Sequence, residues 1–175
     1  MEILSVLSRK INLLDIHEVV AFISENEEEL AALWGMIYSE DRTVSVNALW
    51  VLTHLPQSGQ AFLESHRDEL ADMLMVADDV AKKRMLLQLL RDMEYRQEDI
   101  RTDLLDYCLS KINSECEPYA VRAFGLHLAY KMCRLYPELL SELEEHLSML
   151  RLQEVSPGLA SALRQTEKKI KRVRS

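Results

Sequence analysis

Histidines, cysteines and acidic residues are the groups in this sequence that could hold a metal ion or activate a nucleophile. Five histidines and three cysteines are present. No glutamate lies three residues before any histidine, which excludes the Glu-x-x-His pairs of helical di-iron proteins, and no His-Glu-x-x-His zinc motif occurs. Cys108, Cys116 and Cys133 lie 8 and 17 residues apart and form no CxxC pair, which is a poor zinc pattern. We therefore predict no metal, no cofactor, and free thiols in a reducing compartment.

Glycine-rich loops, which cradle phosphates in many enzymes, are also absent from this sequence. The four glycines are isolated from one another, at Gly35, Gly59, Gly125 and Gly158. Because no phosphate loop and no metal motif can be assigned, we name no catalytic residue and expect a protein that is not an enzyme.

Trp50 is the aromatic residue whose spacing suggests recognition of a partner. In a helix, Thr43, Asn47 and His54 lie at positions −7, −3 and +4 from Trp50, so that all four share one polar face. Two interpretations stay open. Trp50 is either an exposed aromatic anchor for a partner, or a ring packed against the neighbouring repeat.

A row of basic residues continues this face in later helices. A displacement of about 38 residues takes Asn47 to Arg84 and then to Arg122, and takes His54 to Arg91. Such a row would line the second helices of a repeat protein, which usually form the concave side, and would suit an acidic or phosphate-bearing partner. The alternative is a solvated face whose arginines pair with nearby carboxylates.

The charge balance changes along the chain. The net charge is −8, but residues 1–80 hold 4 Lys/Arg and 15 Asp/Glu, whereas residues 81–175 hold 17 and 14. The acidic first half would repel a nucleic acid backbone. The basic stretch Lys168–Arg174 could contact nucleic acid or an anionic membrane, or it could be the charged last turn of a capping helix.

Few helix breakers and good capping residues predict a chain made of helices. Only four Gly and four Pro occur, and no strand pattern is found. We expect about ten helices, with a capping box at Asp15 and Glu18, a later helix capped by Asp78, and a short turn opened by Ser58. Residues 1–25 should form N-terminal capping helices, and residues 156–175 a C-terminal capping helix.

Two interleaved series of helix starts indicate an internal repeat. One series has an acidic residue followed by leucine, at Glu29, Glu69, Asp103 and Glu142. The other series begins near Asp41, Asp78, Glu117 and Ser156. Their steps of 34 to 40 residues predict a two-helix unit repeated four times. We therefore expect residues 1–175 to form a single all-α domain, an α-α superhelix of the HEAT-like solenoid type, in which stacked pairs share one core.

The start of one predicted second helix resembles a known repeat. Residues 118–124, Pro-Tyr-Ala-Val-Arg-Ala-Phe, look like the Val-Arg-x-x-Ala start of the second helix in HEAT repeats, and residues 41–49 follow it more loosely. Over most of its length the chain is similar to HEAT-like and armadillo-type proteins, including small uncharacterised bacterial members, some labelled adenylosuccinate lyase. The serine-rich catalytic loop and the much greater length of those lyases are missing here. The resemblance implies a superhelix that serves as a binding surface or scaffold.

These observations predict a non-catalytic protein–protein interaction or scaffold module that docks an unidentified partner along the ridge of second helices. The alternative is a nucleic-acid-associated protein, similar to HEAT-like alkylation-repair glycosylases, that uses the basic second half. No apolar run is long enough to span a membrane, and the first residues lack a signal-peptide pattern. We therefore expect a cytoplasmic protein that is a monomer or a weak homodimer.

Overall fold

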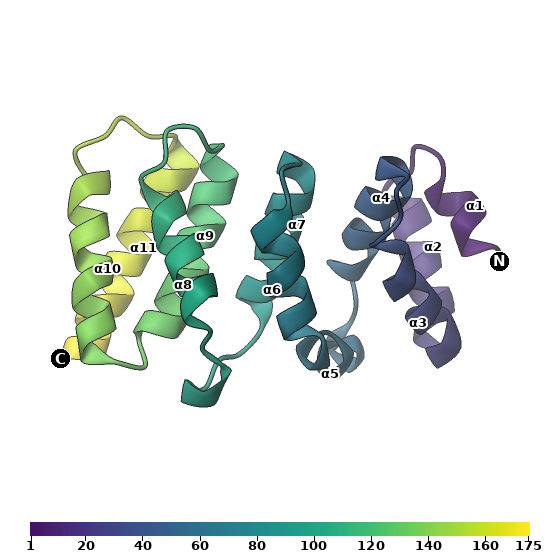
Figure 1. The fold of residues 1–175 in the computed structure, drawn as a ribbon, viewed down its shortest axis with the longest axis horizontal. Helices are drawn as coiled ribbons and strands as arrows, with labels where there is room; N and C mark the ends of the chain where they lie inside the picture. The colour runs from purple at the N-terminus through teal and green to yellow at the C-terminus, as the bar shows by residue number, and fades with distance from the viewer. The chain divides into compact units, whose positions relative to one another are not determined.

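The computed structural model describes all 175 residues and consists of α-helices, turns and two short 3-10 helices (Figure 1). The first five α-helices are α1 (Ile3–Leu7), α2 (Leu13–Ser24), α3 (Glu27–Met36), α4 (Arg42–Leu52) and α5 (Gln60–Ser65). The remaining six are α6 (Arg67–Val76), α7 (Val80–Asp92), α8 (Thr102–Ile112), α9 (Tyr119–Cys133), α10 (Pro137–Leu150) and α11 (Pro157–Arg174). The 3-10 helices are η1 (Gln57–Gly59) and η2 (Gln97–Asp99).

The predicted all-α fold of repeated helix pairs is confirmed. The second helices α4, α7, α9 and α11 begin at intervals of 38, 39 and 38 residues. Each follows a first helix, so that α3 with α4, α6 with α7, α8 with α9 and α10 with α11 form four pairs after α1 and α2. A single helix pair cannot bury both of its apolar faces, and in the C-terminal unit α9 packs against helices of the pairs before and after its own.

The chain divides into two compact units, Met1–Asp68 and Glu69–Ser175, which we call the N-terminal and C-terminal units. In the N-terminal unit, α4 contacts α1, α2 and α3. Its core contains fully buried aliphatic side chains from each of these helices: Leu7, Ile16, Leu33 and Leu49. That residues 1–175 form one continuous domain stays a prediction.

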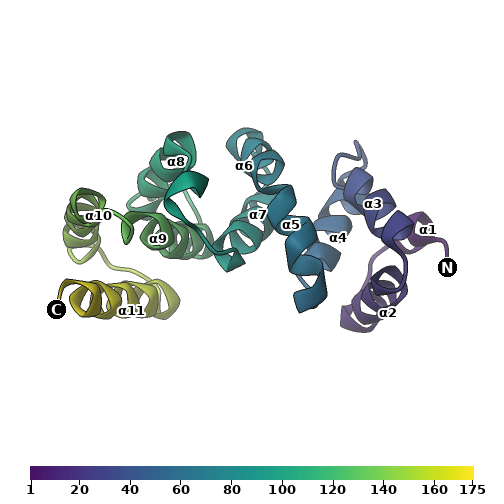
Figure 2. The same cartoon turned by 90° about the horizontal axis from the view of Figure 1, so that it is seen from below.

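Helix α9 is the centre of the C-terminal unit and contacts α7, α8, α10 and α11. More than half of its circumference is buried, by side chains that include Val121, Leu126, Leu128, Ala129, Met132 and Cys133, and a narrower strip with Phe124, His127 and Lys131 is only partly buried. So wide an apolar surface lets α9 pack against neighbours on several sides. Within this unit, Figure 2 shows α7, α9 and α11 in one layer and α6, α8 and α10 in the other.

Two helix starts differ from the sequence prediction. Asn12, and not Asp15, is the N-cap of α2: its side-chain oxygen accepts from the backbone of Leu14 and Asp15, and the Asp15 carboxylate accepts from the backbone N–H of Asn12. This is a reciprocal capping box shifted by one turn. In α7, Asp79 and not Asp78 is the N-cap, because its carboxylate reaches the backbone N–H of Lys82.

The segment expected as a turn after Pro56 contains a further helix. There η1 leads directly into α5, which brings the total to eleven α-helices instead of about ten. Leu63 in α5 is 2% exposed, and the Phe62 and Trp34 rings meet edge to face with their centres 5.7 Å apart. Packing of these apolar side chains stabilises a helix that is too short to form by itself.

Candidate partner-binding surface

Trp50 and His54 lie together on α4, and a histidine of α2 joins them. The Trp50 ring is half-buried, and its centre is 6.3 Å from that of the His54 ring. The His54 ring is in turn 6.2 Å from the ring of His17. Spacing along the helix brings Trp50 and His54 together, whereas His17 arrives through the packing of α2 beside α4. This ring cluster is partly accessible to solvent.

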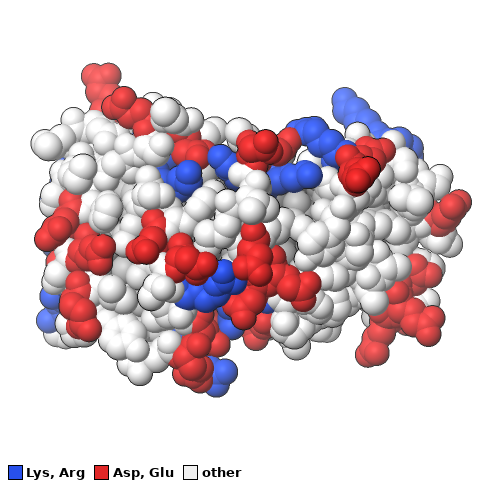
Figure 3. Space-filling view, viewed as in Figure 1, with Lys and Arg blue, Asp and Glu red and all other residues white.

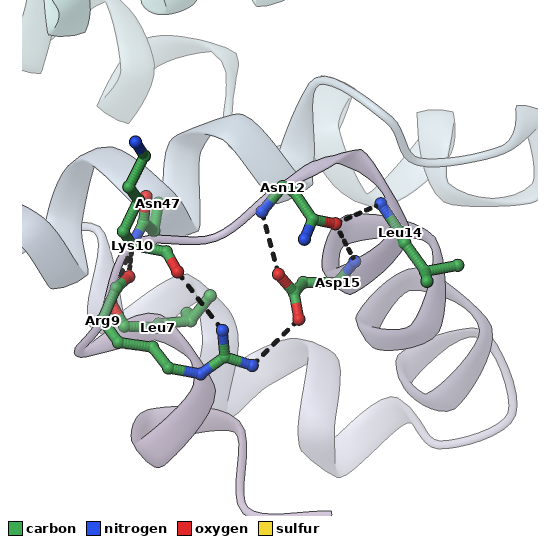
Figure 4. A network of polar contacts seen from close by, with 7 residues as sticks. All are labelled: Leu7, Arg9, Lys10, Asn12, Leu14, Asp15 and Asn47. Carbon is green, nitrogen blue, oxygen red and sulfur yellow. Dashed lines mark hydrogen bonds and ion pairs between the residues drawn. The ribbon is translucent and has the colours of Figure 1, made fainter.

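Asn47, one turn before Trp50, is buried and hydrogen-bonded within the protein. Its side-chain nitrogen donates to the backbone carbonyls of Leu7 and Arg9, at 2.8 and 2.9 Å (Figure 4). Figure 4 also shows the Arg9 guanidinium donating to Asp15, at 2.9 Å. Both amide hydrogens of Asn47 are used in holding the connection between α1 and α2 against α4.

Arg122 occupies the corresponding position of α9 and is used in the same way. Its side chain is buried, with Nε donating to the carbonyl of Ile112 at 2.9 Å and Nη2 donating to Gln153 at 2.6 Å. Gln153 donates in turn to Asn113, at 3.0 Å. This network ties α9 to the end of α8 and to the connection between α10 and α11, so the guanidinium is directed into the protein.

Arg84 and Arg91 lie two turns apart on one face of α7. Arg84 is exposed and makes no ion pair. Arg91 is partly exposed; its guanidinium lies 4.7 Å from the centre of the Phe124 ring in α9 and pairs with Asp92 at 2.8 Å. The ring contact orients the Arg91 side chain without neutralising its charge.

Charge is divided between the two helix layers of the C-terminal unit. The second helices α7, α9 and α11 carry 12 Lys/Arg and 2 Asp/Glu, whereas α8, α10 and the part of α6 from Glu69 onward carry 1 Lys and 8 Asp/Glu. Figure 3 shows acidic side chains distributed over the surface that α8 and α10 form. Eight of the twelve basic side chains on the second helices make no ion pair: Lys82, Arg84, Arg122, Arg164, Lys168, Lys169, Lys171 and Arg172. The second-helix face of this unit is therefore strongly positive.

A cavity of about 520 Å³ opens on this face, and we call it the basic pocket. Five basic residues line it: Arg91 from α7, His127 and Lys131 from α9, Arg134 at the end of α9, and Lys169 from α11. Asp92, Glu94 and Tyr130 complete the lining. Three helices that are distant in sequence thus supply cationic groups to one concave site.

The carboxylates of the basic pocket neutralise its cations only in part. Glu94 is 77% exposed and lies 3.6 Å from both Lys131 and Arg134, which is beyond a good hydrogen bond. Lys131 also donates to the carbonyl of Met93, at 2.8 Å. Lys169 makes no ion pair, and its ammonium lies 5.6 Å from the centre of the Tyr130 ring. One solvated carboxylate shared by two cations contributes little Coulomb energy.

His127 responds to the positive field of the basic pocket. Burial lowers the pKa of its imidazole below the usual value, and the nearby charges of Lys169 and Arg91 lower it further. Both effects disfavour the imidazolium, because one removes water and the other adds like charge. The imidazole of His127 therefore favours its neutral form more than a solvent-exposed histidine does.

The structure brings together some of the residues predicted from the sequence and not others. Trp50 and His54 are neighbours in the N-terminal unit, and Arg84 and Arg91 share a face of α7 in the C-terminal unit. The remaining two, Asn47 and Arg122, are bound inside their own units. The prediction of a partner-binding role for the six residues stays a prediction.

Sequence reasoning missed most of the basic pocket. No binding role was predicted for His127, although His127, Lys131 and Arg134 recur at the spacing of one helix face. Lys169 was considered only as part of the basic stretch Lys168–Arg174, for which both a contact with nucleic acid or membrane and a charged capping turn stayed open. A charge count helix by helix, instead of by half-chain, would have found the division between first and second helices.

The three cysteines of the chain are free thiols. Cys108 and Cys133 are buried and Cys116 is exposed, and none forms a disulfide. Burial raises the pKa of the Cys133 thiol to about 12, with the Glu142 charge adding to the effect.

No group of three or more His, Cys, Asp or Glu side chains is placed to hold a metal ion. No helix combines the length and apolar character required to cross a membrane.

Comparison with known proteins gives one match. A family model described as a HEAT repeat domain matches residues 3–170, which is nearly the whole chain. No curated protein and no solved structure matches.

Proposed function

The chain belongs to the HEAT repeat family, and from this premise we propose that it is a non-catalytic scaffold that docks a partner protein on its second helices. Stacked helix pairs form extended surfaces of the kind that repeat proteins use for binding. The observation that carries the proposal is the division of charge in the C-terminal unit, where α7, α9 and α11 are strongly positive and α8 and α10 are acidic.

The charge division supports an acidic partner segment. Unpaired cations such as Arg84 and Lys169 already lie on the second-helix face, so an anionic segment would gain contacts without breaking ion pairs. Complementary charge of this kind speeds encounter and selects against basic partners. The acidic layer of α8 and α10 would repel the same segment, which would direct docking to one face.

The ring cluster around Trp50 supports a second contact in the N-terminal unit. Trp50 and His54 offer a partly exposed aromatic surface, and large aromatic residues often dominate interface energies. In this proposal Asn47 and Arg122 do not contact the partner. They hydrogen-bond the segments that connect the helices and so stabilise the binding surfaces. We further propose that the protein works in the cytoplasm as a monomer or weak homodimer, which its free thiols support.

The alternative function, nucleic acid binding, draws support from the same positive face. The N-terminal unit opposes it, because residues 1–68 hold 4 Lys/Arg and 11 Asp/Glu. A polyanion would be repelled by that unit, whereas a short acidic segment needs only α7, α9 and α11. A gel shift at low salt with short DNA and RNA separates the two functions, since the scaffold proposal predicts no shift.

Affinity capture from native cell extract tests the proposal when it compares variants of the protein. Wild type, Trp50→Ala, Arg91→Glu and the double variant are immobilised at equal density after nuclease treatment of the extract, and retained proteins are identified by mass spectrometry. We expect a protein that the wild type retains and the double variant loses at least about tenfold, since hot-spot side chains are often worth 1–2 kcal/mol or more. The single variants then assign the contact to one unit or to both.

Lys10→Glu is the matched control, because Lys10 is exposed, lies outside the second helices and undergoes the same charge reversal. Thermal unfolding confirms that each variant is folded. Equal retention of the same proteins by wild type and the double variant would remove this surface from the proposal.

A further inference from the structure

We propose that the basic pocket binds a phosphate monoester carried by a phosphorylated side chain of the partner segment. This inference rests on the proposed docking function and names the group that the pocket recognises. The proposal stands on the three-helix cavity and its excess of cationic side chains, described above with their contacts.

The charge of the basic pocket matches a dianion. Arg91, Lys131, Arg134 and Lys169 contribute four positive charges, and the two carboxylates of the lining contribute two negative charges. A phosphorylated side chain carries a charge of about −1.5 to −2 at neutral pH, whereas a carboxylate carries a single charge. One phosphate monoester would neutralise this excess charge, whereas one carboxylate would leave part of it.

The donors of the basic pocket remain available for a phosphate. Arg134 contacts only the exposed carboxylate of Glu94, at 3.6 Å, and Lys169 has no anionic partner. An arginine fork and a lysine ammonium on one concave surface are the usual means of phosphate recognition in proteins. The cavity volume of about 520 Å³ leaves room for the phosphoryl group and part of the segment that carries it.

The other cavities of the C-terminal unit have a smaller excess of positive charge or cations that are already bound. The cavity at the end of α10 and α11 contains Arg151 and Arg174, which pair with Glu167 and Glu144 of the same cavity, and one unpaired cation, Lys171. The cavity beside Tyr119 contains Arg122, whose donors go to Ile112 and Gln153. The basic pocket is thus distinguished by its charge balance, four Arg/Lys side chains against two carboxylates, whereas the cavity of α10 and α11 has three against two.

Two features favour a phosphorylated protein segment over a nucleic acid. Asp92 and Glu94 are half or more exposed at the pocket, where they would repel the neighbouring phosphates of a continuous backbone. Single-stranded nucleic acids also need exposed rings for stacking, and Tyr130 is only 9% exposed. A peptide that presents one phosphate avoids both difficulties.

The test is an NMR titration of the intact, isotopically labelled protein with N-acetyl-O-phosphoserine amide at low salt, beside N-acetyl-aspartate amide. We expect saturable shifts centred on His127, Arg134 and Lys169, and an affinity for the phosphoserine probe about tenfold above that for the aspartate probe. Lys169→Glu and Arg134→Glu should each weaken phosphoserine binding about tenfold or more. Lys168→Glu is the matched control, because Lys168 is the adjacent exposed lysine of α11 and lies outside the pocket, and it should weaken binding less than about twofold.

Several results would overturn the inference: the absence of saturable shifts, equal affinity for the two probes, or equal loss in Lys168→Glu and Lys169→Glu. Phosphatase treatment of the cell extract separates this inference from the proposed function. Capture that is lost in Arg91→Glu but survives phosphatase treatment keeps the scaffold and removes the phosphate. Tight binding of a DNA or RNA oligonucleotide that Lys168→Glu and Lys169→Glu weaken equally would overturn both.

Discussion

The ammonium group of Lys169 in α11 lies 5.6 Å from the centre of the Tyr130 ring in α9. This contact holds an otherwise unpaired cation at the basic pocket, because the ring attracts the charge without neutralising it. Burial lowers the pKa of His127, and the same ammonium lowers it further, together with Arg91. Lys169 thus adds to the positive field of the pocket, and its effect can be measured through the pKa of His127.

Sulfate should raise the pKa of His127. In the free protein burial, Lys169 and Arg91 hold this pKa below its usual value, and a bound dianion opposes the two positive charges. By linkage, sulfate should then bind more tightly as the pH falls through the titration range of His127. The His127 imidazole shifts, followed by NMR against pH with sulfate or with chloride at matched ionic strength, measure this effect.

Sulfate is the appropriate anion for this measurement because it stays doubly charged over the range in which a phosphate monoester changes its own charge. Lys169→Glu should raise the His127 pKa even without sulfate and should abolish the sulfate effect. A His127 titration that is the same in sulfate and chloride would contradict an anion site at this position.

Asn47→Ala should destabilise the N-terminal unit by about 2 kcal/mol. The buried backbone carbonyl of Leu7 and the backbone carbonyl of Arg9 would both lose the hydrogen bond that the Asn47 amide donates. The connection between α1 and α2 should also become more accessible to proteases, since these bonds hold it against α4. Chemical denaturation and limited proteolysis measure the two effects.

Asn26→Ala is the control for Asn47→Ala. Asn26 is the exposed N-cap of α3, and its side chain makes no capping hydrogen bond. The change should therefore alter stability by less than about 0.5 kcal/mol. Equal destabilisation by the two substitutions would mean that the Asn47 amide does not hold the α1–α2 connection.

Glu117→Gln should destabilise the C-terminal unit by about 1–3 kcal/mol near neutral pH. The Glu117 side chain is 9% exposed, and its carboxylate lies 3.0 Å from the ammonium groups of both Lys83 and Lys111, so that it joins α7 and α8 at the start of α9. The substitution leaves two lysines without their shared anion. Urea denaturation at several pH values measures the loss.

The pH dependence of this loss has a definite sign. Burial disfavours the Glu117 carboxylate, but the hydrogen bonds from Lys111 and Lys83 prevail and hold its pKa below the usual value. The stabilisation is therefore present above the unfolded-state value, about 4.3, and is lost as the pH falls through the lower folded-state pKa. The difference between wild type and Glu117→Gln should shrink over that acid range; a constant difference would contradict the ion-pair account.

In the folded protein, iodoacetamide should modify only one thiol per chain. Cys116 is exposed, whereas Cys108 and Cys133 are buried and burial raises the pKa of both thiols, that of Cys133 to about 12. Both features suppress the reactive thiolate. Mass spectrometry after iodoacetamide should find Cys116 modified first and all three modified after denaturation; Cys108 reacting as fast as Cys116 would contradict the packing of α8 against α9.

The repeat was predictable because it depends on local signals that recur. Asp41 caps α4 as expected, and Ser156 caps α11, so the interval between second helices could be read from capping residues alone. The starts of α2 and α7 were missed by three residues and by one, because neighbouring polar residues compete for the same N-cap position.

The surface was harder to predict because position in a repeat does not determine what a side chain contacts. Asn47 and Arg122 share a register with the exposed Arg84, yet both turn inward to backbone carbonyls. The basic pocket needs Arg91 and Lys169, which are 78 residues apart and meet only through their packing around α9. This contact between distant residues depends on tertiary packing, so no local sequence motif predicts it.

Amide shift mapping with a hexaglutamate peptide is the most direct test of the central claim, that the second-helix face of the C-terminal unit docks an acidic segment. At low salt we predict saturable shifts on α7, α9 and α11, with α8 and α10 unchanged and with the response weakened in Lys169→Glu. Absence of binding, or shifts centred on α8 and α10 or on the N-terminal unit, would contradict the account.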